Sequence, residues 1–249
     1  REAKAAQARE QLESILAQEF GDFELIISDN ASTDGTQEIC ETYAKSDPRI
    51  TYSRLSTNVG ASGNYNRVFR MSQGEFFKWA AHDDLLHPAF LARCVEAFDT
   101  SDVAPALVYP KAEFIDENGD NTGPDMTRMV TSSGQPFVRA FEALHGMSAV
   151  ASAVFGVFQA SVLEKTRLID NFFASDCVLM LEIALLGRIM QLDGPPLFQR
   201  RLHPGISTKA NVSHRDRLHW YDPTERARLS PGAKLIVEYV RSPVRLGPL

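Results

Sequence analysis

Short apolar runs alternate with helical segments through the first hundred residues, and this alternation constrains the fold more than any other feature. Runs at 23–28, 49–54 and 76–81 have the length of buried strands. Between them, apolar residues recur at helical spacing. Such an order is typical of a sheet of parallel strands wound with helices. We therefore expect an α/β domain with a mostly parallel central sheet flanked by helices.

The same patterns give the remaining elements. Further strands are expected at 106–115 and 188–192, and residues 121–135, which have no clear period, are expected to form a loop. One or two surface helices are expected in the tail, 211–249. The expected helices, each with apolar residues at helical spacing or helix-starting signals, are 1–18, 36–45, 67–71, 88–98, 136–145 and 177–186.

Charge and cysteine content exclude several classes of protein. The chain of 249 residues has a formal net charge of −6, so no overall positive field would attract a nucleic acid. No apolar run approaches the roughly 18 residues of a membrane span. Three cysteines lie far apart and form no metal-type spacing, which favours a reducing, cytoplasmic location.

The carboxyl end has a basic bias, carried by Arg226, Arg228, Lys234, Arg241 and Arg245. Such residues could attract the protein to an anionic membrane surface. The alternative, which we favour at this point, is an ordinary solvated helix face and tail. Peripheral membrane contact is therefore an open expectation.

Two adjacent carboxylates, Asp83 and Asp84, follow the apolar run at 76–81. They would emerge at the carboxyl end of a strand, where open α/β sheets bind ligands. Because neighbouring carboxylates repel each other, a cation is expected to compensate them. Oxygen ligands suit Mg²⁺ or Mn²⁺ shared with a substrate phosphate. The alternative is a solvated turn before the helix that Pro88 opens.

Polar residues also follow the first strand. Asp29 and Asn30 lie at its carboxyl edge and are candidates for contacting a ligand. Asp34 and Gln37 have the spacing of a capping box, so we expect a structural role for Asp34. The small residues of 58–66 would allow close backbone approach to an anion at a helix start, although they match neither common glycine-rich loop.

Four stretches together resemble glycosyltransferase family 2, the inverting nucleotide-sugar transferases of GT-A fold. They are 23–36, Asn58-x-Gly60 with Asn64, His82-Asp83-Asp84, and Ser175-Asp176 followed by Arg201-Leu202-His203. They occur in the family's order and extend over roughly residues 12 to 208.

The resemblance implies a role for each of these residues. Asn30, preceded by Asp29, would contact a pyrimidine ring of a UDP- or dTDP-sugar, and Asn58, Gly60 and Asn64 would belong to the same nucleotide site. Asp83 would lie near the ribose. Asp84 would hold the Mg²⁺ or Mn²⁺ that bridges the diphosphate, although Ala81 replaces the leading acid of the commoner motif.

On the acceptor side, the resemblance makes Asp176 the catalytic base. It would begin the buried helix 177–186, where the helix dipole favours an ionised carboxylate. The competing interpretation is a simple N-cap. The resemblance also places His203 near the metal or diphosphate and Arg201 near phosphate. His82 and His87 are less favoured as ligands.

Members of this family begin with a strand that precedes the first helix, and this sequence starts within that helix. We expect the full-length protein to contain that strand. The expected organisation is a GT-A domain at 1–208 and a helical extension at 209–249. Within the domain, 1–115 would bind the nucleotide and 116–208 would hold the acceptor and base.

The expected function is metal-dependent, inverting transfer of a sugar from a nucleotide sugar to an acceptor hydroxyl, in surface polysaccharide or lipid-linked glycan assembly. One alternative is a nucleotidyltransferase, for which the sequence lacks a glycine-rich amino-terminal loop with a phosphate-binding lysine. The other is a non-catalytic module that binds sugar nucleotides. Pyrophosphate as product would favour the first alternative, and binding without turnover the second.

Overall fold

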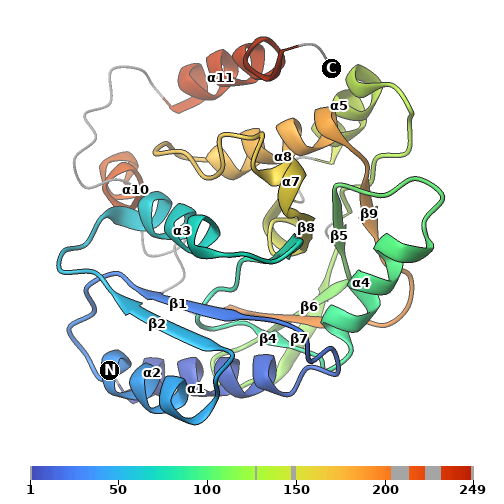
Figure 1. Cartoon of the computed structure of the whole chain (residues 1–249). Coiled ribbons are helices and arrows are strands. Elements are labelled where there is room, and N and C mark those ends of the chain that lie inside the picture. Colours follow the sequence, from blue (N-terminus) through green and yellow to red (C-terminus); the bar gives the residue numbers. More distant parts are fainter. Residues whose placement is uncertain (1, 127, 147–149, 203–212, 222–230, 248–249) are drawn as a thin grey trace.

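The computed structural model describes residues 2–126, 128–146, 150–202, 213–221 and 231–247 (Figure 1). Its helices, in chain order, are α1 (Glu2–Leu16), α2 (Thr36–Ser46), α3 (Gly60–Met71), α4 (Phe90–Thr100), α5 (Pro136–His145), α6 (Val150–Ala153), α7 (Ala160–Leu163), α8 (Ser175–Leu186), α10 (His214–Tyr221) and α11 (Pro231–Leu246). Its strands are β1 (Leu25–Asp29), β2 (Ile50–Arg54), β3 (Phe76–Phe77), β4 (Leu85–Leu86), β5 (Leu107–Tyr109), β6 (Ala112–Ile115), β7 (Asn121–Asp125), β8 (Val157–Gln159), β9 (Ile189–Gln191) and β10 (Phe198–Arg201).

The first half of the chain contains a parallel βαβ unit. β1 and β2 pair in parallel register, with Leu25 opposite Ile50 and Asp29 opposite Arg54. The crossover between them is α2, as parallel strands require. α3 covers one face of this pair, and α1 and α2 lie on the other (Figure 1). The carboxyl end of β1 therefore meets the start of α3.

Two further sheets complete the α/β fold. One has the order β3-β8-β5-β9 and the other β4-β10-β6-β7. Within the described residues, three strand pairings are parallel and four are antiparallel. The α/β architecture is confirmed, but the sheets are mixed rather than mostly parallel, because short return strands such as β7 and β8 run against their neighbours.

The core is built around α8 and a group of aromatic rings. From Val178 to Leu185 every residue of α8 is buried, which explains why its sequence is apolar nearly all round. The Trp79 ring packs edge-to-face on Phe77 and Phe158, with centroid distances of 5.0 and 5.5 Å. Such edge-to-face pairs add stability beyond their burial. Two members of this group, Phe77 and Trp79, shortly precede Asp83 and Asp84 in the chain.

Two expected strands differ in the structure. The run at 76–81 is a strand only at Phe76–Phe77, because its antiparallel partner β8 ends its pairing there. The expected strand at 106–115 is two strands, β5 and β6, in different sheets. Pro110 lies between them, and proline has no N–H to continue a ladder. Asp83 and Asp84 thus lie in a loop between β3 and β4.

The segment expected to be a loop, 121–135, begins with a strand. β7 pairs antiparallel with β6 across a turn in which the Asp116 carboxylate accepts hydrogen bonds from the N–H groups of Asn118 and Asp120. Gly119 has φ of +92°, which a glycine adopts without strain. The turn could be predicted from its residue types. The strand after it could not, because its residues show no alternation of apolar and polar side chains.

The two helices of the carboxyl-terminal part pack on the rest of the domain. Ser62 Oγ of α3 donates a hydrogen bond to the carbonyl oxygen of Tyr221 at the end of α10. α11 lies against α8, where Arg167 and Arg245 both pair with the buried Glu182. In the part of the chain that is described, none of the helices has the length and apolar character needed to cross a bilayer.

Candidate active site

The carboxyl end of β1 and the start of α3 form one cluster of predicted site residues. Asn30 Nδ2 donates to Asn58 Oδ1 at 2.9 Å and to the Gly60 carbonyl oxygen at 3.2 Å. In return, Asn30 Oδ1 accepts from the backbone N–H of Val59 at 2.9 Å. Asn58 Oδ1 also accepts from the Gly60 N–H. These bonds join two loops that are separated in sequence but were predicted to serve one nucleotide site.

Asn64 belongs to the same region but faces the strand. Its Oδ1 accepts from Ser28 Oγ at 2.6 Å, and its Nδ2 donates to the Ser28 carbonyl oxygen at 3.0 Å. Arg67 donates to Ser28 Oγ and to Ser53 Oγ. Asn64 and Arg67 therefore fasten α3 to β1 and β2, and Asn64 positions the cluster through these contacts.

Asp29 is buried and already has several partners. Its carboxylate accepts from the Ser32 N–H at 2.7 Å and from Tyr52 Oη at 2.8 Å, and lies 3.4 Å from Arg54. Burial alone would raise the pKa of Asp29, but the hydrogen bonds from Ser32 and Tyr52 and the charge of Arg54 lower it. Asp29 is thus an ionised anchor of the loop, and Ala31, two residues further along, has φ of +61°.

Asp34 does not form the expected capping box. α2 begins at Thr36 with Gly35 as its N-cap, and Asp34 Oδ1 accepts from the N–H and the hydroxyl of Thr36. Gln37 donates its side-chain amide to Glu41 one turn along the helix. Asp34 has the expected structural role in a different geometry. Its side chain bonds to the first residue of α2 from the position before the N-cap Gly35.

Asp83 and Asp84 form a second cluster. Both are buried, and Asp84 Oδ1 accepts from the backbone N–H of Arg201 at 2.9 Å. Burial, and then the neighbouring charge of Asp83, raise the pKa of Asp84 to about 6. The positive charges of Arg200 and Lys78 act in the opposite direction without cancelling this effect. A cation placed beside these carboxylates would therefore relieve an unfavourable charge.

The Arg201 side chain bonds to the backbone of this loop. Its Nε donates to the Asp83 carbonyl oxygen at 3.0 Å, and its Nη1 donates to the carbonyl oxygens of Asp116 and Glu117 at 3.1 and 3.2 Å. Its Nη2 lies 2.7 Å from a Glu10 carboxylate oxygen. The guanidinium is therefore occupied by the protein itself, and the expected phosphate contact stays a prediction.

Lys78 is a partly buried cation that the sequence did not single out. Its Nζ donates to the Trp79 carbonyl oxygen at 2.9 Å and lies 4.8 Å from the Phe90 ring centroid. Burial lowers its pKa to about 8, although the charges of Asp84 and Cys94 favour its protonated form. Lys78 thus supplies part of the positive charge behind Asp84.

Asp176 lies in the first turn of α8. The N-cap of this helix is Ala174, with φ of +63° and no side-chain capping bond, so Asp176 is not the N-cap. Asp176 Oδ1 accepts from the adjacent Cys177 N–H at 3.1 Å. Burial raises the pKa of Asp176 above its ordinary value, and this effect outweighs the backbone hydrogen bonds that lower it. The expectation of a carboxylate ionised by the helix dipole is therefore too simple, because burial opposes it.

Tyr65 joins the carboxylates into one site. Its pKa is raised first by burial and then by the negative charges of Asp84, Asp83 and Asp176 together. The charges of three carboxylates from two distant parts of the chain therefore act on one phenol. Tyr65 is fixed by its backbone, since Trp79 Nε1 donates to its carbonyl oxygen at 2.9 Å. Asn64, the preceding residue of α3, links this site to the cluster at β1.

Tyr221 extends the site toward α10. Burial raises its pKa first, and the charges of Asp176 and Tyr65 add to that effect. Neither tyrosine carried a motif in the sequence. Tyr65 lies within the small-residue stretch 58–66, and Tyr221 lies in the tail, so only the packing of α10 on α3 shows that they share a site.

Of the predicted histidines, His203 lies outside the described residues. His82 is exposed, with its Nδ1 4.0 Å from Asp83 Oδ1. His87 accepts a hydrogen bond from the Ala89 N–H near the start of α4. His87 therefore has a local structural role.

The donor set at Asp83 and Asp84 fits a hard divalent cation in part. Carboxylate oxygens are the ligands that Mg²⁺ and Mn²⁺ prefer. Among the described residues there is no group of three or more acidic, histidine or cysteine side chains around a common point. Such a pair suits an ion that takes its remaining ligands from a substrate diphosphate and water, rather than one held by the protein alone.

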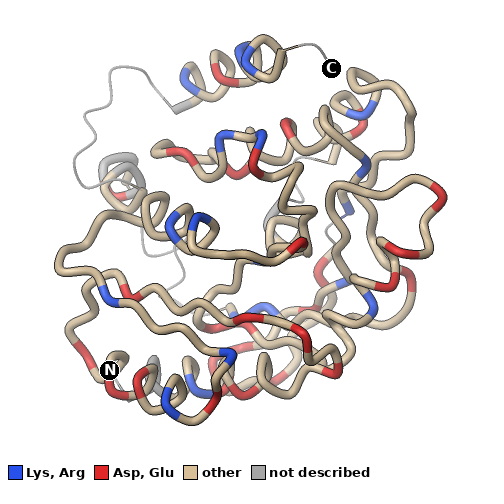
Figure 2. Tube along the Cα trace, in the orientation of Figure 1, with Lys and Arg blue, Asp and Glu red and all other residues tan. Residues whose placement is uncertain are grey.

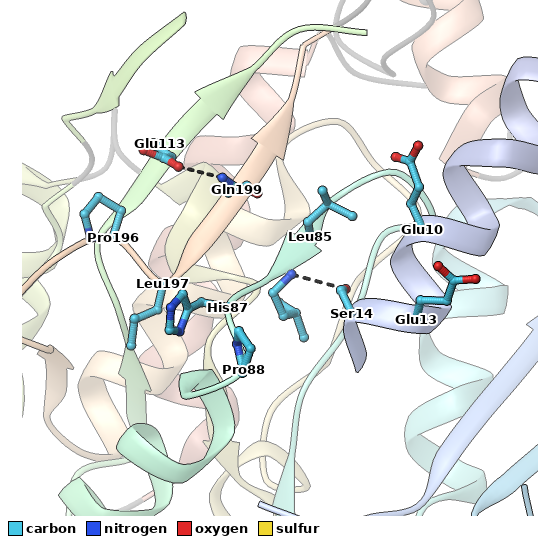
Figure 3. A pocket seen from close by; sticks show the side chains of 11 residues that line it. Glu10, Glu13, Ser14, Leu85, His87, Pro88, Glu113, Pro196, Leu197 and Gln199 are labelled. Atoms are coloured by element: carbon cyan, nitrogen blue, oxygen red, sulfur yellow. Dashed lines mark hydrogen bonds between the residues drawn. The ribbon is translucent and has the colours of Figure 1, made fainter. Parts of the chain in front are cut away.

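A separate cavity lies between α1 and the β4–β10–β6 sheet, with a volume of about 380 Å³ (Figure 3). Glu10, Glu13 and Glu113 line it, together with apolar residues such as Leu197. Of the candidate ligands named from the sequence, His87 alone lines it, and the negative charge of the cavity would repel a diphosphate. The cavity lies next to the second cluster, since Leu85, which follows Asp84 in the chain, lines it and Arg201 pairs with Glu10.

Comparison with known proteins finds relatives and structural neighbours that are glycosyltransferases. A glucosyltransferase of Campylobacter jejuni, named for acting on GalNAc(5)-diNAcBac-PP-undecaprenol, is 26% identical over 69% of this chain and 53% of its own length. The structure of S. aureus TarS 1–349 in complex with UDP-GlcNAc matches with a TM-score of 0.66 and 17% identity, over 96% of this chain and 69% of that one. The mannosyltransferase PcManGT of Pyrobaculum calidifontis, in complex with GDP-Man and Mn²⁺, matches with a TM-score of 0.57 and 16% identity, over 97% and 68%.

These structural matches confirm the GT-A fold. Among the curated relatives, the chain spans between 12% and 56% of the relative's own length. The family model for glycosyl transferase family 2 matches residues 3–166, which is more than half of the chain. The chain therefore belongs to glycosyltransferase family 2.

Proposed function

We propose that this protein transfers a sugar from a UDP- or dTDP-sugar to an acceptor hydroxyl, with inversion at the anomeric carbon and with the help of Mg²⁺ or Mn²⁺. The observation that carries the proposal is the position of Tyr65, whose phenol lies within the influence of Asp83, Asp84 and Asp176. In this proposal, a pair of carboxylates suited to a metal and a separate carboxylate suited to a base belong to one site.

In this proposal the β1–α3 cluster binds the nucleoside. The Asn30 amide offers an acceptor to a pyrimidine ring N–H, and it is held by Asn58, Val59 and Gly60. The buried Asp29 keeps that loop in place, and Asn64 holds α3 against β1. The names of the two structural matches, one with UDP-GlcNAc and one with GDP-Man and Mn²⁺, support a nucleotide-sugar donor and a divalent ion.

Asp83 and Asp84 would hold the metal. When bound, a divalent ion supplies positive charge that offsets the negative charge developing on the leaving diphosphate. The protein's own part is to place two carboxylates there in a buried loop, with Arg201 bonded to its backbone. Because Asp84 is unfavourably charged without a cation, its ionisation and metal binding should be coupled.

Asp176 would act as the general base. It takes the proton from the acceptor hydroxyl as the hydroxyl oxygen bonds to the anomeric carbon, on the face opposite the breaking bond to the diphosphate. One displacement of this kind inverts the configuration. The raised pKa of Asp176 supports the role, because a general base works best when its pKa approaches the working pH.

The acceptor and compartment are also proposals. The relative named for an undecaprenol-linked glycan supports a glycan or lipid-linked acceptor in polysaccharide assembly. All three cysteines are free thiols, which supports a reducing, cytoplasmic location.

The test compares Asp176→Asn with Asp102→Asn, an exposed aspartate outside the site, as the matched control. We expect Asp176→Asn to bind nucleoside diphosphate in calorimetry like the wild type and to lose at least about 100-fold in turnover, since a positioned base contributes about 10²–10⁴-fold. The measurement is release of nucleoside diphosphate from a panel of nucleotide sugars with a mixture of acceptors. Full turnover by Asp176→Asn would disprove the base assignment, and release of pyrophosphate would show a nucleotidyltransferase.

A further inference from the structure

α11 carries an apolar stripe that faces away from the protein. Ile236, Val240 and Val244 recur every four residues, so they lie on one side of the helix. Their exposed fractions are 65%, 70% and 82%. Single exposed apolar residues are ordinary, but a row of branched side chains on one helix marks an interaction surface.

The opposite side of α11 is fixed to the protein. Tyr239 and Leu246 pack against the α8 residues Leu181 and Leu185. Glu238, which is buried, lies 2.6 Å from Arg167 Nη1. Turning the apolar stripe inward would break this packing and leave buried charges without partners, which costs several kcal/mol by order of magnitude. The stripe is therefore a stable outward face of the folded chain.

α5 extends the apolar surface. Its Phe137, Phe141 and Leu144 are 65%, 63% and 43% exposed. Both α5 and α11 pack on α8, where Ala140 of α5 and Tyr239 of α11 belong to one apolar group with Leu181 and Leu185. Figure 1 shows both helices along one edge of the molecule, with α8 beneath them. We call the exposed residues of these two helices the α5–α11 face.

The exposed charges of α11 are positive. Lys234, Arg241 and Arg245 have side-chain exposures of 35%, 70% and 39%, whereas the one acidic residue of the helix, Glu238, is 9% exposed. This helix stands out against the chain's formal net charge of −6, and Figure 2 shows acidic residues spread over much of the remaining trace. On a helical wheel, the three cations lie together beside the apolar stripe.

We infer that the α5–α11 face binds an anionic lipid surface. Apolar side chains beside a row of cations are the pattern of a helix that lies in the plane of a membrane interface. A second copy of this chain is a poorer fit, because a two-fold interface would bring the same cations of both copies together. The residues that would enter the interface are Phe137, Phe141, Leu144, Ile236, Val240 and Val244. Lys234 and Arg241, which share the single carboxylate of Glu238, would contact lipid phosphates, whereas Arg245 is held by the buried Glu182.

The inference goes beyond the proposed function, since no residue of the active site takes part in it. It nevertheless has a consequence for that function. α11 packs along α8, and α8 begins with the turn that carries Asp176. A lipid surface on α11 would therefore lie along the helix that holds the candidate base, on the acceptor side of the site.

The test is co-sedimentation of the full chain with vesicles of phosphatidylcholine alone or mixed equally with phosphatidylglycerol. We expect binding to the mixed vesicles that weakens with salt. Ile236→Ser combined with Val240→Ser should weaken it at least about tenfold, from the loss of apolar burial. Val103→Ser, at a valine that is 51% exposed elsewhere, is the matched control and should change nothing.

A second pair of variants tests the charge. Arg241→Gln should weaken binding about fivefold, which corresponds to about 1 kcal/mol for one cation near an anionic surface. Arg93→Gln, an arginine of α4 with half of its side chain exposed, should not. Thermal unfolding should show that all variants fold, because the changed side chains are exposed.

Any of three results would overturn the inference. The first is wild-type protein that stays in the supernatant with anionic vesicles, and the second is apolar variants that bind like the wild type. The third is a wild-type dimer in sedimentation velocity that the apolar variants convert to monomer, which would assign the face to a second copy. Turnover of a nucleotide sugar with a water-soluble acceptor would be normal in all three cases, so failure of this inference is distinguishable from failure of the proposed function.

Discussion

The substitution Asp84→Asn should make the metal-free protein more stable at neutral pH while removing its response to Mn²⁺. The asparagine oxygen can still accept the hydrogen bond from the Arg201 N–H, so the loop keeps its geometry. What disappears is a buried negative charge. Its neighbour Asp83 keeps its own charge and no longer has another carboxylate to repel it.

The size of the effect follows from the pKa of Asp84. The folded pKa is about 6 and the ordinary value is 3.8, a difference of about two units, or about 3 kcal/mol. Because the folded pKa is the higher one, ionising Asp84 costs the folded state free energy. That cost is absent below pH 3.8, grows between pH 3.8 and 6, and is complete above pH 6.

The assay is thermal unfolding of wild type and Asp84→Asn in EDTA at pH 8 and pH 5, and again with Mn²⁺ at pH 8. In EDTA at pH 8 the variant should unfold about 6–12 °C higher, since about 1 kcal/mol shifts the midpoint of a domain this size by 2–4 °C. The difference should shrink at pH 5. Mn²⁺ should raise the midpoint of the wild type alone, because only it binds the ion in its native state.

Asp84→Asn unfolding at or below the wild-type temperature in EDTA at pH 8 would refute the reasoning. So would an equal rise with Mn²⁺ in both proteins, which would place the ion elsewhere. A difference that stays the same at pH 5 and pH 8 would show that something other than the charge of Asp84 is responsible.

Two further predictions concern the core. Glu182→Gln should lower the free energy of unfolding, measured by urea titration, by about 3 kcal/mol, because Arg167 loses a buried charged partner at 2.9 Å. The control Glu164→Gln, on the surface, should change the free energy of unfolding by less than about 0.5 kcal/mol. Gly156→Ala should cost about 1–3 kcal/mol, because the new methyl group would lie 2.7 Å from a backbone carbonyl oxygen and two side chains. Gly134→Ala, with open space around it, should be nearly neutral, and equal effects of the two alanines would contradict the packing argument.

Helices could be predicted from the sequence better than strands. The helix expected at 136–145 is α5 with the same bounds, because a proline at its first position and a glycine after its end mark both limits. β3 was overestimated, since apolar character shows burial but not where a partner strand ends. β7 was missed because its residues are polar on both sides, and only its pairing with β6 defines it.

The site was predictable residue by residue but not as an arrangement. Asp83 and Asp84 could be recognised in the sequence as an adjacent pair of carboxylates, and the position of Asp176 matched a family pattern. That the charges of all three carboxylates act on Tyr65 of α3 depends on the tertiary fold, since Tyr65 and Asp176 lie more than a hundred residues apart in sequence. Burial, and with it the raised pKa of Asp176, likewise follows from tertiary packing and has no local signal.

The Arg201 side chain bonds to four residues from three places along the chain: Glu10, Asp83, and the adjacent Asp116 and Glu117. Alanine scanning for residues that recognise the donor would therefore give a large effect at this position, even if the guanidinium never meets a phosphate. A lysine there would keep the charge and lose the forked geometry. Comparing the alanine and lysine variants would show whether Arg201 maintains the structure of the site or contacts the substrate. Loss of activity in the alanine variant alone does not distinguish these two roles.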